Sequence, residues 1–236
     1  MIVYACIAPH GEVDLAPELR AAMEELGRRF AAAAPDVAVI VTPHSVHVDG
    51  HFAVVTAGNV GEWETDAEVV AALLEAPLPV LGVSYGGNDP ATAEFPLDWG
   101  TEVPLEFLRP PRIVVVSPAR DRPLEEHLRL GEAIAALPGR VALVASADHG
   151  HAHDADGPYG FDPGAAEYDD RIQQLVGENR LDALLELGPL AAAAKADSLW
   201  QLLVLHGALV DRARVELLSY EAPTYYGMLC AAYEPR

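Results

Sequence analysis

Residues 2–44 read IVYACIAPHGEVDLAPELRAAMEELGRRFAAAAPDVAVIVTPH, and the order of apolar and amphipathic segments in this stretch decides the fold class. Residues 2–8 and 37–42 are apolar runs of strand length, and residues 16–34 between them have helical spacing and a helix-forming composition. Both runs are too continuously apolar to keep one face in water, which indicates a buried sheet. A strand, a helix and a strand in this order favour a layered α/β fold.

The rest of the chain continues this alternation. Further apolar runs predict strands at residues 52–56, 80–83, 113–117, 141–145, 215–219 and 228–232. Amphipathic stretches predict helices at residues 66–75, 124–137, 164–176 and 196–212. The short connection APTYYG, residues 222–227, favours an antiparallel pairing of the last two strands. We therefore expect one domain over residues 1–236, with an α/β fold in which helices flank a mixed, mostly parallel central sheet.

The composition argues against several classes of partner. The chain has 15 Lys and Arg residues against 36 Asp and Glu residues, a formal net charge of −21, which repels nucleic acid and anionic lipid surfaces. No apolar stretch approaches the roughly 18 residues of a membrane span, and the start MIVYACIAPHG lacks the basic residues of a signal peptide, so we expect a cytoplasmic protein without a membrane partner. Cys6 and Cys230 lie in apolar segments and are expected to be buried free thiols. Lys195 is the only lysine, and the sequence assigns it no function.

Histidines and a carboxylate follow several of the predicted strands. His10 and His44 each come after a proline at the end of a strand, the stretch ASADHGHAHD at residues 145–154 follows a third strand, and Glu221 follows a fourth. Ligands of open α/β sheets gather at the carboxyl ends of the strands, so these side chains can converge there. Two histidines and one carboxylate form the facial arrangement of non-haem Fe(II) oxygenases. The ordinary alternative is a set of turn histidines hydrogen-bonded to backbone.

Five short motifs, taken in order, resemble one known family. They are IAPHG at residues 7–11, VTPHS at 41–45, DWGTEVPLEFL at 98–108, SADHGH at 146–151 and YEAPTYYGM at 220–228. In this order and spacing the chain resembles the catalytic subunits of class III extradiol ring-cleavage dioxygenases, of the protocatechuate 4,5-dioxygenase beta-subunit type. The resemblance covers most of the chain.

The resemblance implies an activity and a role for each matching residue. It implies an Fe(II)-dependent enzyme that opens a catechol or a similar dihydroxy aromatic ring with dioxygen, with His10, His44 and Glu221 as iron ligands and His151 as acid/base. A free imidazole can take a proton from the diol and return it, provided that it is not bound to the metal. On the substrate side we expect the residues His149, His47 and Trp99. The family also implies a homo-oligomer or a small partner subunit.

Two other interpretations of the same residues stay open. Because His and carboxylate ligands bind several divalent metals, a Zn(II) or Mn(II) hydrolase could use the same site. Trp99 stands where many family members have a histidine, and this departure allows a non-catalytic binding protein on the same scaffold. Oxygen uptake on a panel of diols separates these alternatives.

The remaining polar residues near the motifs have ordinary interpretations. Asp148 either orients an imidazole or caps the turn that follows it. His127 is expected on a solvated helix face, His206 in the core, and His153 in a mobile loop over residues 151–163. A carboxylated substrate would need a cation, for which the candidates are Arg109, Arg112 and Arg120.

Overall fold

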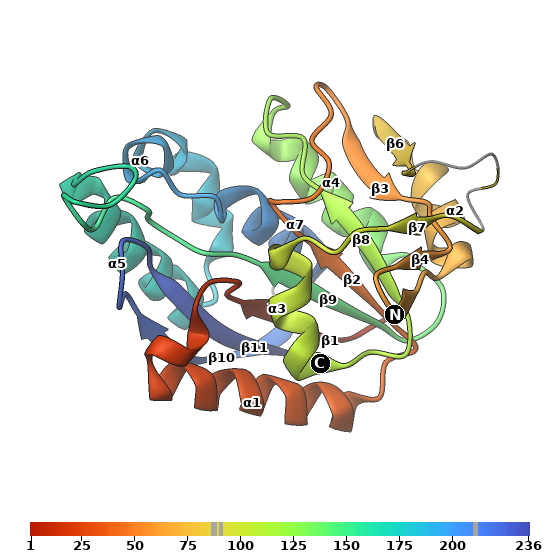
Figure 1. Ribbon diagram of the computed structural model, residues 1–236, viewed down its shortest axis with the longest axis horizontal. Helices are drawn as coiled ribbons and strands as arrows, with labels where there is room; N and C mark the ends of the chain where they lie inside the picture. Colours follow the sequence, from red (N-terminus) through yellow and green to blue (C-terminus); the bar gives the residue numbers. More distant parts are fainter. Residues whose placement is uncertain (86–88, 90–91, 210–211) are drawn as a thin grey trace.

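The computed structural model describes residues 1–85, 89, 92–209 and 212–236 and is built around one large sheet (Figure 1). Its strands are β1 (Ile2–Ala8), β2 (Val37–Val41), β3 (Phe52–Val55), β6 (Val80–Val83), β8 (Ile113–Ser117), β9 (Val141–Ser146), β10 (Ala213–Glu221) and β11 (Met228–Pro235). They form one eight-stranded sheet in the order β10-β11-β1-β9-β2-β8-β3-β6. A small second sheet has the order β5-β4-β7 and contains β4 (Asn59–Val60), β5 (Trp63–Glu64) and β7 (Glu94–Phe95).

The central strands run parallel and bring their carboxyl ends together. β9 pairs in parallel with β1 on one side and with β2 on the other, and β2 pairs in parallel with β8. Antiparallel pairs join β10 to β11, β11 to β1 and β3 to β8. In this register Ala8 lies beside Ser146, and Val41 lies beside Ala145. The predicted mixed, mostly parallel sheet is confirmed, and the segments after β1, β2 and β9 leave it at one edge.

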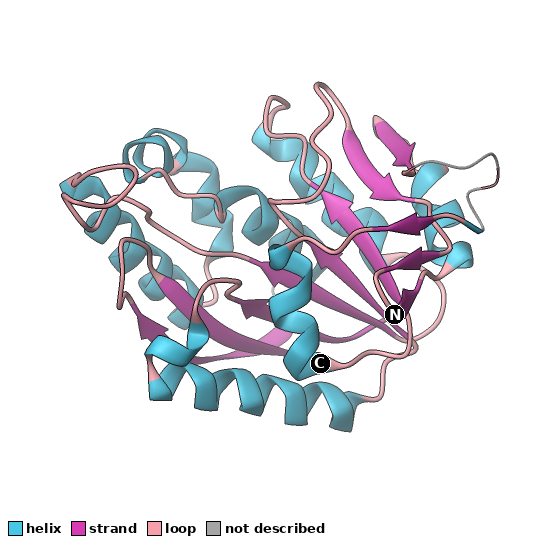
Figure 2. Cartoon of the chain, viewed as in Figure 1, coloured by secondary structure: helices cyan, strands magenta, loops and turns pink. Residues whose placement is uncertain are grey.

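Helices cover both faces of the large sheet (Figure 2). The α-helices are α1 (Pro17–Ala33), α2 (Ala67–Leu74), α3 (Trp99–Leu108), α4 (Leu124–Ala135), α5 (Pro163–Gly177), α6 (Gly188–Ala194) and α7 (Leu199–Leu209), and the 3-10 helices are η1 (Val13–Leu15) and η3 (Leu181–Glu186). The buried side chains of α1 and α3 belong to one apolar cluster, and those of α2, α4, α5 and α7 belong to the other. The predicted layered α/β architecture is therefore confirmed.

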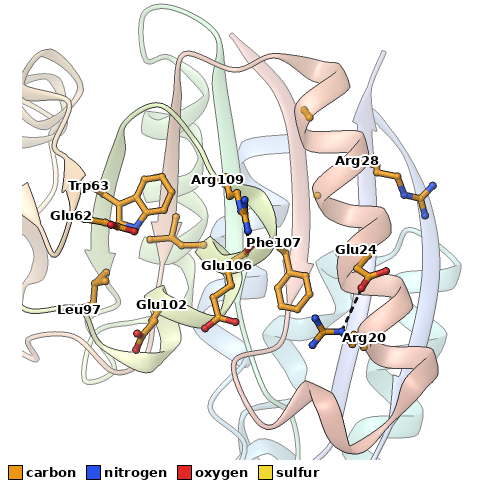
Figure 3. A pocket seen from close by; sticks show the side chains of 13 residues that line it. Arg20, Glu24, Arg28, Glu62, Trp63, Leu97, Glu102, Glu106, Phe107 and Arg109 are labelled. Carbon is orange, nitrogen blue, oxygen red and sulfur yellow. Dashed lines mark hydrogen bonds and ion pairs between the residues drawn. The ribbon is translucent and has the colours of Figure 1, made fainter.

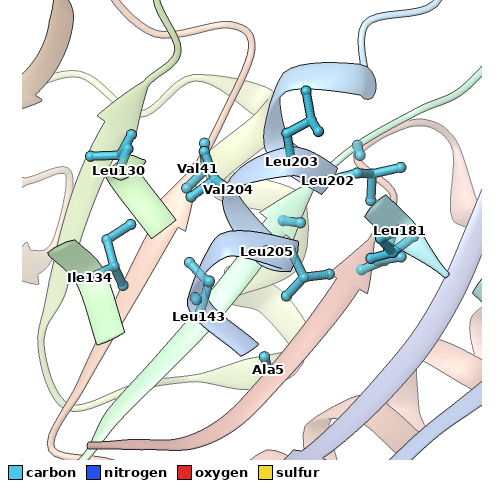
Figure 4. Close-up of a cluster of buried hydrophobic side chains, with 14 of the residues drawn as sticks. Ala5, Val41, Leu130, Ile134, Leu143, Leu181, Leu202, Leu203, Val204 and Leu205 are labelled. Atoms are coloured by element: carbon cyan, nitrogen blue, oxygen red, sulfur yellow. The ribbon is translucent and has the colours of Figure 1, made fainter. Parts of the chain in front are cut away.

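The close crossing of α4 and α7 depends on two glycines. A Cβ at Gly131 would lie 2.1 Å from the carbonyl oxygen of Val204, and a Cβ at Gly207 would lie 2.0 Å from that of Leu128. The two helix backbones can approach this closely only because both positions lack a side chain. On α7, Leu202, Leu203 and Leu205 belong to the same apolar cluster as Leu130 and Leu143 (Figure 4).

Several details differ from the sequence-based expectations. α7 begins at Leu199, so Asp197 precedes the helix that was predicted to contain it, and residues 210–211 of that prediction lie outside the described residues. α3 was not predicted, because its sequence contains Gly100 and Pro104, which are poor helix formers. Asp98 compensates by capping this helix through its contact with the Thr101 N–H at 3.0 Å.

The histidine of α4 is not on a solvated face, so that prediction is wrong. His127 is fully buried, and its ring meets the ring of Phe52 at a centroid distance of 5.0 Å. The helix turns this position inward because Leu130 and Ile134, three and seven residues later, face the same core. Cys6 and Cys230 are buried free thiols, as expected. Among the described residues, no helix is long and apolar enough to cross a membrane.

Candidate metal centre and active site

His10 follows β1 at the centre of the sheet edge and is held in one orientation. Its Nδ1 lies 3.0 Å from the hydroxyl oxygen of Ser146, and that hydroxyl donates its own hydrogen to the carbonyl of Gly100. Since a serine hydroxyl has one hydrogen, Ser146 accepts from the Nδ1–H of His10. The Nε2 of His10 is therefore the nitrogen left for other partners.

His44 follows β2 and brings its own Nε2 to the same point. The two Nε2 atoms of His10 and His44 are 2.9 Å apart. The backbone N–H of His44 donates to the Thr42 hydroxyl at 3.2 Å, and the indole of Trp99 lies against the His44 ring at a centroid distance of 4.4 Å. The predicted meeting of the two Pro-His motifs is thus present in the structure.

Asp197 supplies the carboxylate beside this histidine pair. Its Oδ2 lies 3.7 Å from His10 Nε2 and 3.5 Å from His44 Nε2, and one ligand atom from each of the three residues falls within 4.8 Å of the others. The other oxygen, Oδ1, is buried and has no hydrogen-bond partner among the described residues. The side chain of His10 is 1% exposed, that of Asp197 11% and that of His44 24%, so the group opens to solvent on the His44 side.

The surroundings of the two histidines shift their pKa values in opposite directions. As long as no metal is bound, burial lowers the pKa of His10, but the carboxylates of Asp148 and Asp197 outweigh this effect and raise it to about 9. Burial, with the positive charge of His10 as a second cause, lowers the pKa of His44 to about 4. With no metal bound, these opposite shifts favour a hydrogen bond from His10 Nε2 to His44 Nε2.

Asp148 orients the His10 segment. Its Oδ1 accepts the backbone N–H of His10 at 3.1 Å, and its Oδ2 lies 3.5 Å from His10 Nε2. Of the two interpretations given to this residue, the structure favours the orienting one, although the residue that Asp148 orients is His10 and not a histidine of its own motif.

His151 stands at the wall of a pocket that opens on this group. Its Nδ1 donates to the carbonyl of His149 at 2.7 Å, which leaves Nε2 as the free nitrogen, and its ring is stacked on Tyr226 at 5.5 Å. The pocket has a volume of about 780 Å³, within the ordinary range of small-molecule sites. His44, His151 and Asp197 all line it, so the predicted acid/base residue faces the same space as the candidate ligands.

The same pocket carries positive charge. Three cations line it, Arg120, Arg122 and Lys195, against the single carboxylate of Asp197. Arg122 is paired with Glu126 at 2.6 Å, whereas Arg120 forms no ion pair with any described residue. The guanidinium of Arg120 donates to the carbonyl of Pro43 at 3.0 Å and lies 4.9 Å from the centre of the Trp200 ring.

A second, larger pocket of about 900 Å³ lies between α1, α3 and the small sheet (Figure 3). Its polar lining consists of arginines and glutamates, among them Arg20 and Glu24, which form an ion pair at 3.4 Å. The two pockets share no lining residue, and none of the candidate ligands lines the larger one. The histidine group, and not the pocket size, therefore identifies the candidate active site.

Some of the predicted site residues do not join this group. Glu221 is the last residue of β10, and β11 lies between β10 and β1. Because neighbouring strands are about 4.8 Å apart, the backbone of Glu221 lies roughly 10 Å from β1, the strand that precedes His10. The carboxylate that the structure groups with His10 and His44 is that of Asp197. His149 is fully buried, with Nδ1 on the Ser198 hydroxyl at 3.0 Å, and does not line the pocket. His47 is exposed and also lies outside the pocket lining.

Sequence reasoning did not single out Asp197. The sequence pattern predicts a helix over residues 196–212 and so puts Asp197 and Ser198 in its first turn. A usable signal was present, because Asp and Ser directly before an apolar run are typical of a helix start and place a carboxylate at the end of an element. Arg120 could not be distinguished from the other arginines without the fold.

Comparisons with known proteins identify the family of the chain. The chain matches the family described as "Catalytic LigB subunit of aromatic ring-opening dioxygenase" over residues 2–230. It is 24% identical over 196 residues to Protein CA_C1420 of Clostridium acetobutylicum, an alignment that covers 70% of this chain and 40% of that protein. The chain thus spans about 40% of the length of this relative.

A solved structure shares the fold. The crystal structure of the uncharacterized protein JW3007 from Escherichia coli K12 has a TM-score of 0.71 and 17% sequence identity, and the alignment covers 98% of this chain and 99% of that one. At this identity the likeness concerns the fold alone. The family match, by contrast, extends over almost the whole sequence. The resemblance inferred from the five motifs is confirmed, and the chain belongs to the LigB family of catalytic subunits of aromatic ring-opening dioxygenases.

Proposed function

We propose that this protein is a non-haem Fe(II)-dependent extradiol dioxygenase and that His10, His44 and Asp197 hold its metal. The observation that carries the proposal is the grouping of two imidazole nitrogens and one carboxylate oxygen within 4.8 Å. Two histidines and a carboxylate are the ligand set of the facial triad, which leaves positions open for substrate and dioxygen. Asp197 takes the place that the sequence motifs assigned to Glu221.

The separations of the three donor atoms fit a shared ion. Two donors bound at about 2.1 Å lie about 3.0 Å apart at a right angle and about 3.4 Å apart at a tetrahedral angle. The separations of 2.9, 3.5 and 3.7 Å among His10, His44 and Asp197 are close to these values. The hydrogen bond from His10 to Ser146 supports the fit, because a ligating histidine usually donates its other N–H to a neighbouring acceptor.

The residues of the pocket account for the remaining steps. Ferrous iron bound there would let an aromatic diol and dioxygen meet on one centre. His151 has a free Nε2 at the pocket wall, so it can accept a proton from a diol hydroxyl and return it after ring opening. Its Nδ1 is committed to the carbonyl of His149, which keeps the basic nitrogen directed away from the backbone.

The pocket also suggests how the substrate is oriented. Aromatic rings line it at Tyr159 and Trp200, which suits a planar substrate. Arg120 uses one of its five N–H donors on Pro43, so the rest of its fork is available for a carboxylate on the substrate. Lys195, the only lysine of the chain, adds a second positive charge to this wall.

Reconstitution with Fe(II) under anaerobic conditions, followed by oxygen uptake on a panel of catechols, tests the activity. We expect stoichiometric iron and oxygen consumption with at least one diol. Bound iron without oxygen uptake for every diol would contradict the proposal, and hydrolysis of model esters or amides by the Zn(II)-loaded protein would favour a hydrolase instead.

Four variants test the assignment of roles. His10→Ala and Asp197→Ala should lose iron, His151→Ala should keep iron and lose turnover, and Glu221→Ala should keep both, since Glu221 lies outside the group. Iron loss in Glu221→Ala with iron retained in Asp197→Ala would mean that the motif-based ligand set is the correct one.

A further inference from the structure

A buried aspartate outside the five motifs holds the segment that carries His151. Asp169 lies on α5, with its side chain 1% exposed. Its Oδ1 accepts the backbone N–H of Gly150 at 2.7 Å, and its Oδ2 accepts from His153 Nε2 at 2.8 Å and from the Tyr220 hydroxyl at 2.7 Å. One carboxylate therefore joins three segments: α5, the residues around His151, and β10.

The other side of the same segment is held by the turn between β10 and β11. The N–H of His149 donates to the carbonyl of Gly227 at 2.8 Å, and the N–H of Gly227 donates to the carbonyl of Gly150 at 3.0 Å. A Cβ at Gly227 would lie 2.0 Å from Oδ2 of Asp169, so the backbone of the turn packs directly against the carboxylate. Gly150 is thus bonded through both of its backbone polar groups, directly before His151.

These contacts also set the orientation of the His151 ring. The acceptor of its Nδ1–H is the carbonyl of His149, which belongs to the doubly bonded stretch of residues 149–150. On the other side, His153 is held by Asp169 through its ring and by the Tyr225 carbonyl through its backbone N–H at 3.1 Å. The expectation that His153 belongs to a mobile loop therefore does not fit its contacts, because its ring is an anchor.

We propose that Asp169 is a positioning residue for His151, an inference that rests on the proposed role of His151 in proton transfer. Asp169 fixes Gly150 and His153, which flank the pair His151 and Ala152. These two contacts hold the His151 ring so that its Nε2 faces the pocket. Charge-assisted hydrogen bonds from a buried carboxylate suit this task, since they are stronger than neutral ones and geometrically demanding. A displacement of the base by about 1 Å can cost on the order of 10²-fold in rate.

The hydroxyl of Tyr220 remains a donor in this arrangement. Burial, followed by the negative charge of Asp169, raises the pKa of Tyr220, so the phenol stays protonated at every pH of interest. Asp169 does not line the pocket, so it acts through the backbone and through His153 and not on the substrate.

Substitution of Asp169, with its neighbour as a matched control, tests the inference. Asp169→Ala removes all three acceptor contacts and should lower kcat about 100-fold, with KM changed less than about threefold and iron content unchanged. Asp169→Asn should recover most of the rate, because its oxygen can accept from Gly150 and its amide can donate to Tyr220 and to an unprotonated His153 nitrogen. Asp170→Ala, at the exposed next position, should change nothing.

A measurement without turnover separates this inference from the proposed function. Nitrogen-15 spectra of the histidine rings report the tautomer of His151 even if no diol is oxidised. Asp169→Ala should change the His151 signals, which a matched His151→Gln spectrum identifies, and Asp170→Ala should not. Unchanged His151 signals in a folded Asp169→Ala protein overturn the inference, as does equal loss of kcat in Asp169→Ala and Asp169→Asn.

If Asp169→Ala does not fold, its two Oδ2 partners can be removed singly. His153→Ala disturbs the segment that carries His151 and should lower kcat about tenfold or more, whereas Tyr220→Phe removes a contact on β10 and should lower it less than about threefold. Equal effects of the two variants would mean that Asp169 stabilises the fold generally, which also overturns the inference.

Discussion

Acidification from pH 7 to pH 5 should weaken the fold through the buried histidine of α4. The ring of His127 is fully buried against Phe52, its Nδ1 donates to the carbonyl of Pro123 at 3.3 Å, and its Nε2 has no hydrogen-bond partner among the described residues. Burial lowers the pKa of His127 to about 4 from the ordinary value of 6.5. Between these two pH values His127 is therefore protonated in the unfolded chain but not in the folded protein.

The size of the effect follows from this difference in pKa. Because the pKa is lowered in the folded state, the unfolded chain binds the proton first as the pH falls below 6.5, and the free energy of unfolding decreases. At pH 5 the unfolded chain has passed its pKa by about 1.5 units, worth about 2 kcal/mol. Close to pH 4 the loss approaches about 3 kcal/mol, and below that pH the folded state also takes up the proton.

Urea unfolding at pH 7 and pH 5 measures this loss, with His127→Asn as the variant that cannot titrate. The free energy of unfolding of the wild type should fall by about 2 kcal/mol more than that of His127→Asn between the two pH values. The same comparison with His51→Asn, at an exposed position, controls for the removal of an imidazole as such. An equal fall in wild type and His127→Asn would refute the reasoning that burial suppresses the charge of this ring.

Three further predictions concern the helix crossing, the metal group and the pocket. Gly207→Ala should lower the free energy of unfolding by about 1–3 kcal/mol, because a Cβ there meets a helix backbone, whereas Gly177→Ala, with no atom within 4 Å, should be neutral or stabilising in the same urea titration. Ser146→Ala should weaken metal binding about 10- to 100-fold in a chelator competition, since His10 loses the acceptor of its Nδ1–H; unchanged affinity would contradict this role. Arg120→Gln should lower kcat/KM for a carboxylated catechol about tenfold or more relative to the corresponding carboxamide, and an unchanged ratio would exclude it as the carboxylate partner.

The central strands could be predicted well because they are buried on both faces. Residues 2–8 and 113–117 form strands with the predicted ends, since an apolar run bounded by polar or turn residues defines where the strand begins and ends. α3 could not be predicted in this way, because the contact of Asp98 with Thr42, at 2.8 Å, and the tight fit of Gly100 against the same side chain come from the tertiary structure. His127 was misplaced because one polar residue on an amphipathic helix does not reveal which face is covered.

The two histidines of the candidate site could be predicted, because they directly follow strands of the sheet, whereas the carboxylate could not. His10 and His44 follow parallel strands on the two sides of β9, so their meeting follows from the α/β pattern. The choice between Asp197 and Glu221 depends instead on strand order and on where α7 begins. Neither the position of β11 between β10 and β1 nor the start of α7 can be read from apolar periodicity.

The distribution of the three donor residues along the chain bears on when the metal group can form during synthesis. His10 and His44 are 34 positions apart and follow the first two strands, whereas Asp197 precedes α7 and follows β3, β6, β8 and β9. A nascent or truncated chain therefore presents the histidine pair long before its carboxylate. Metal retained by the purified protein would then report that the chain has been made and folded at least as far as Asp197, rather than mark an early nucleus around which it folds.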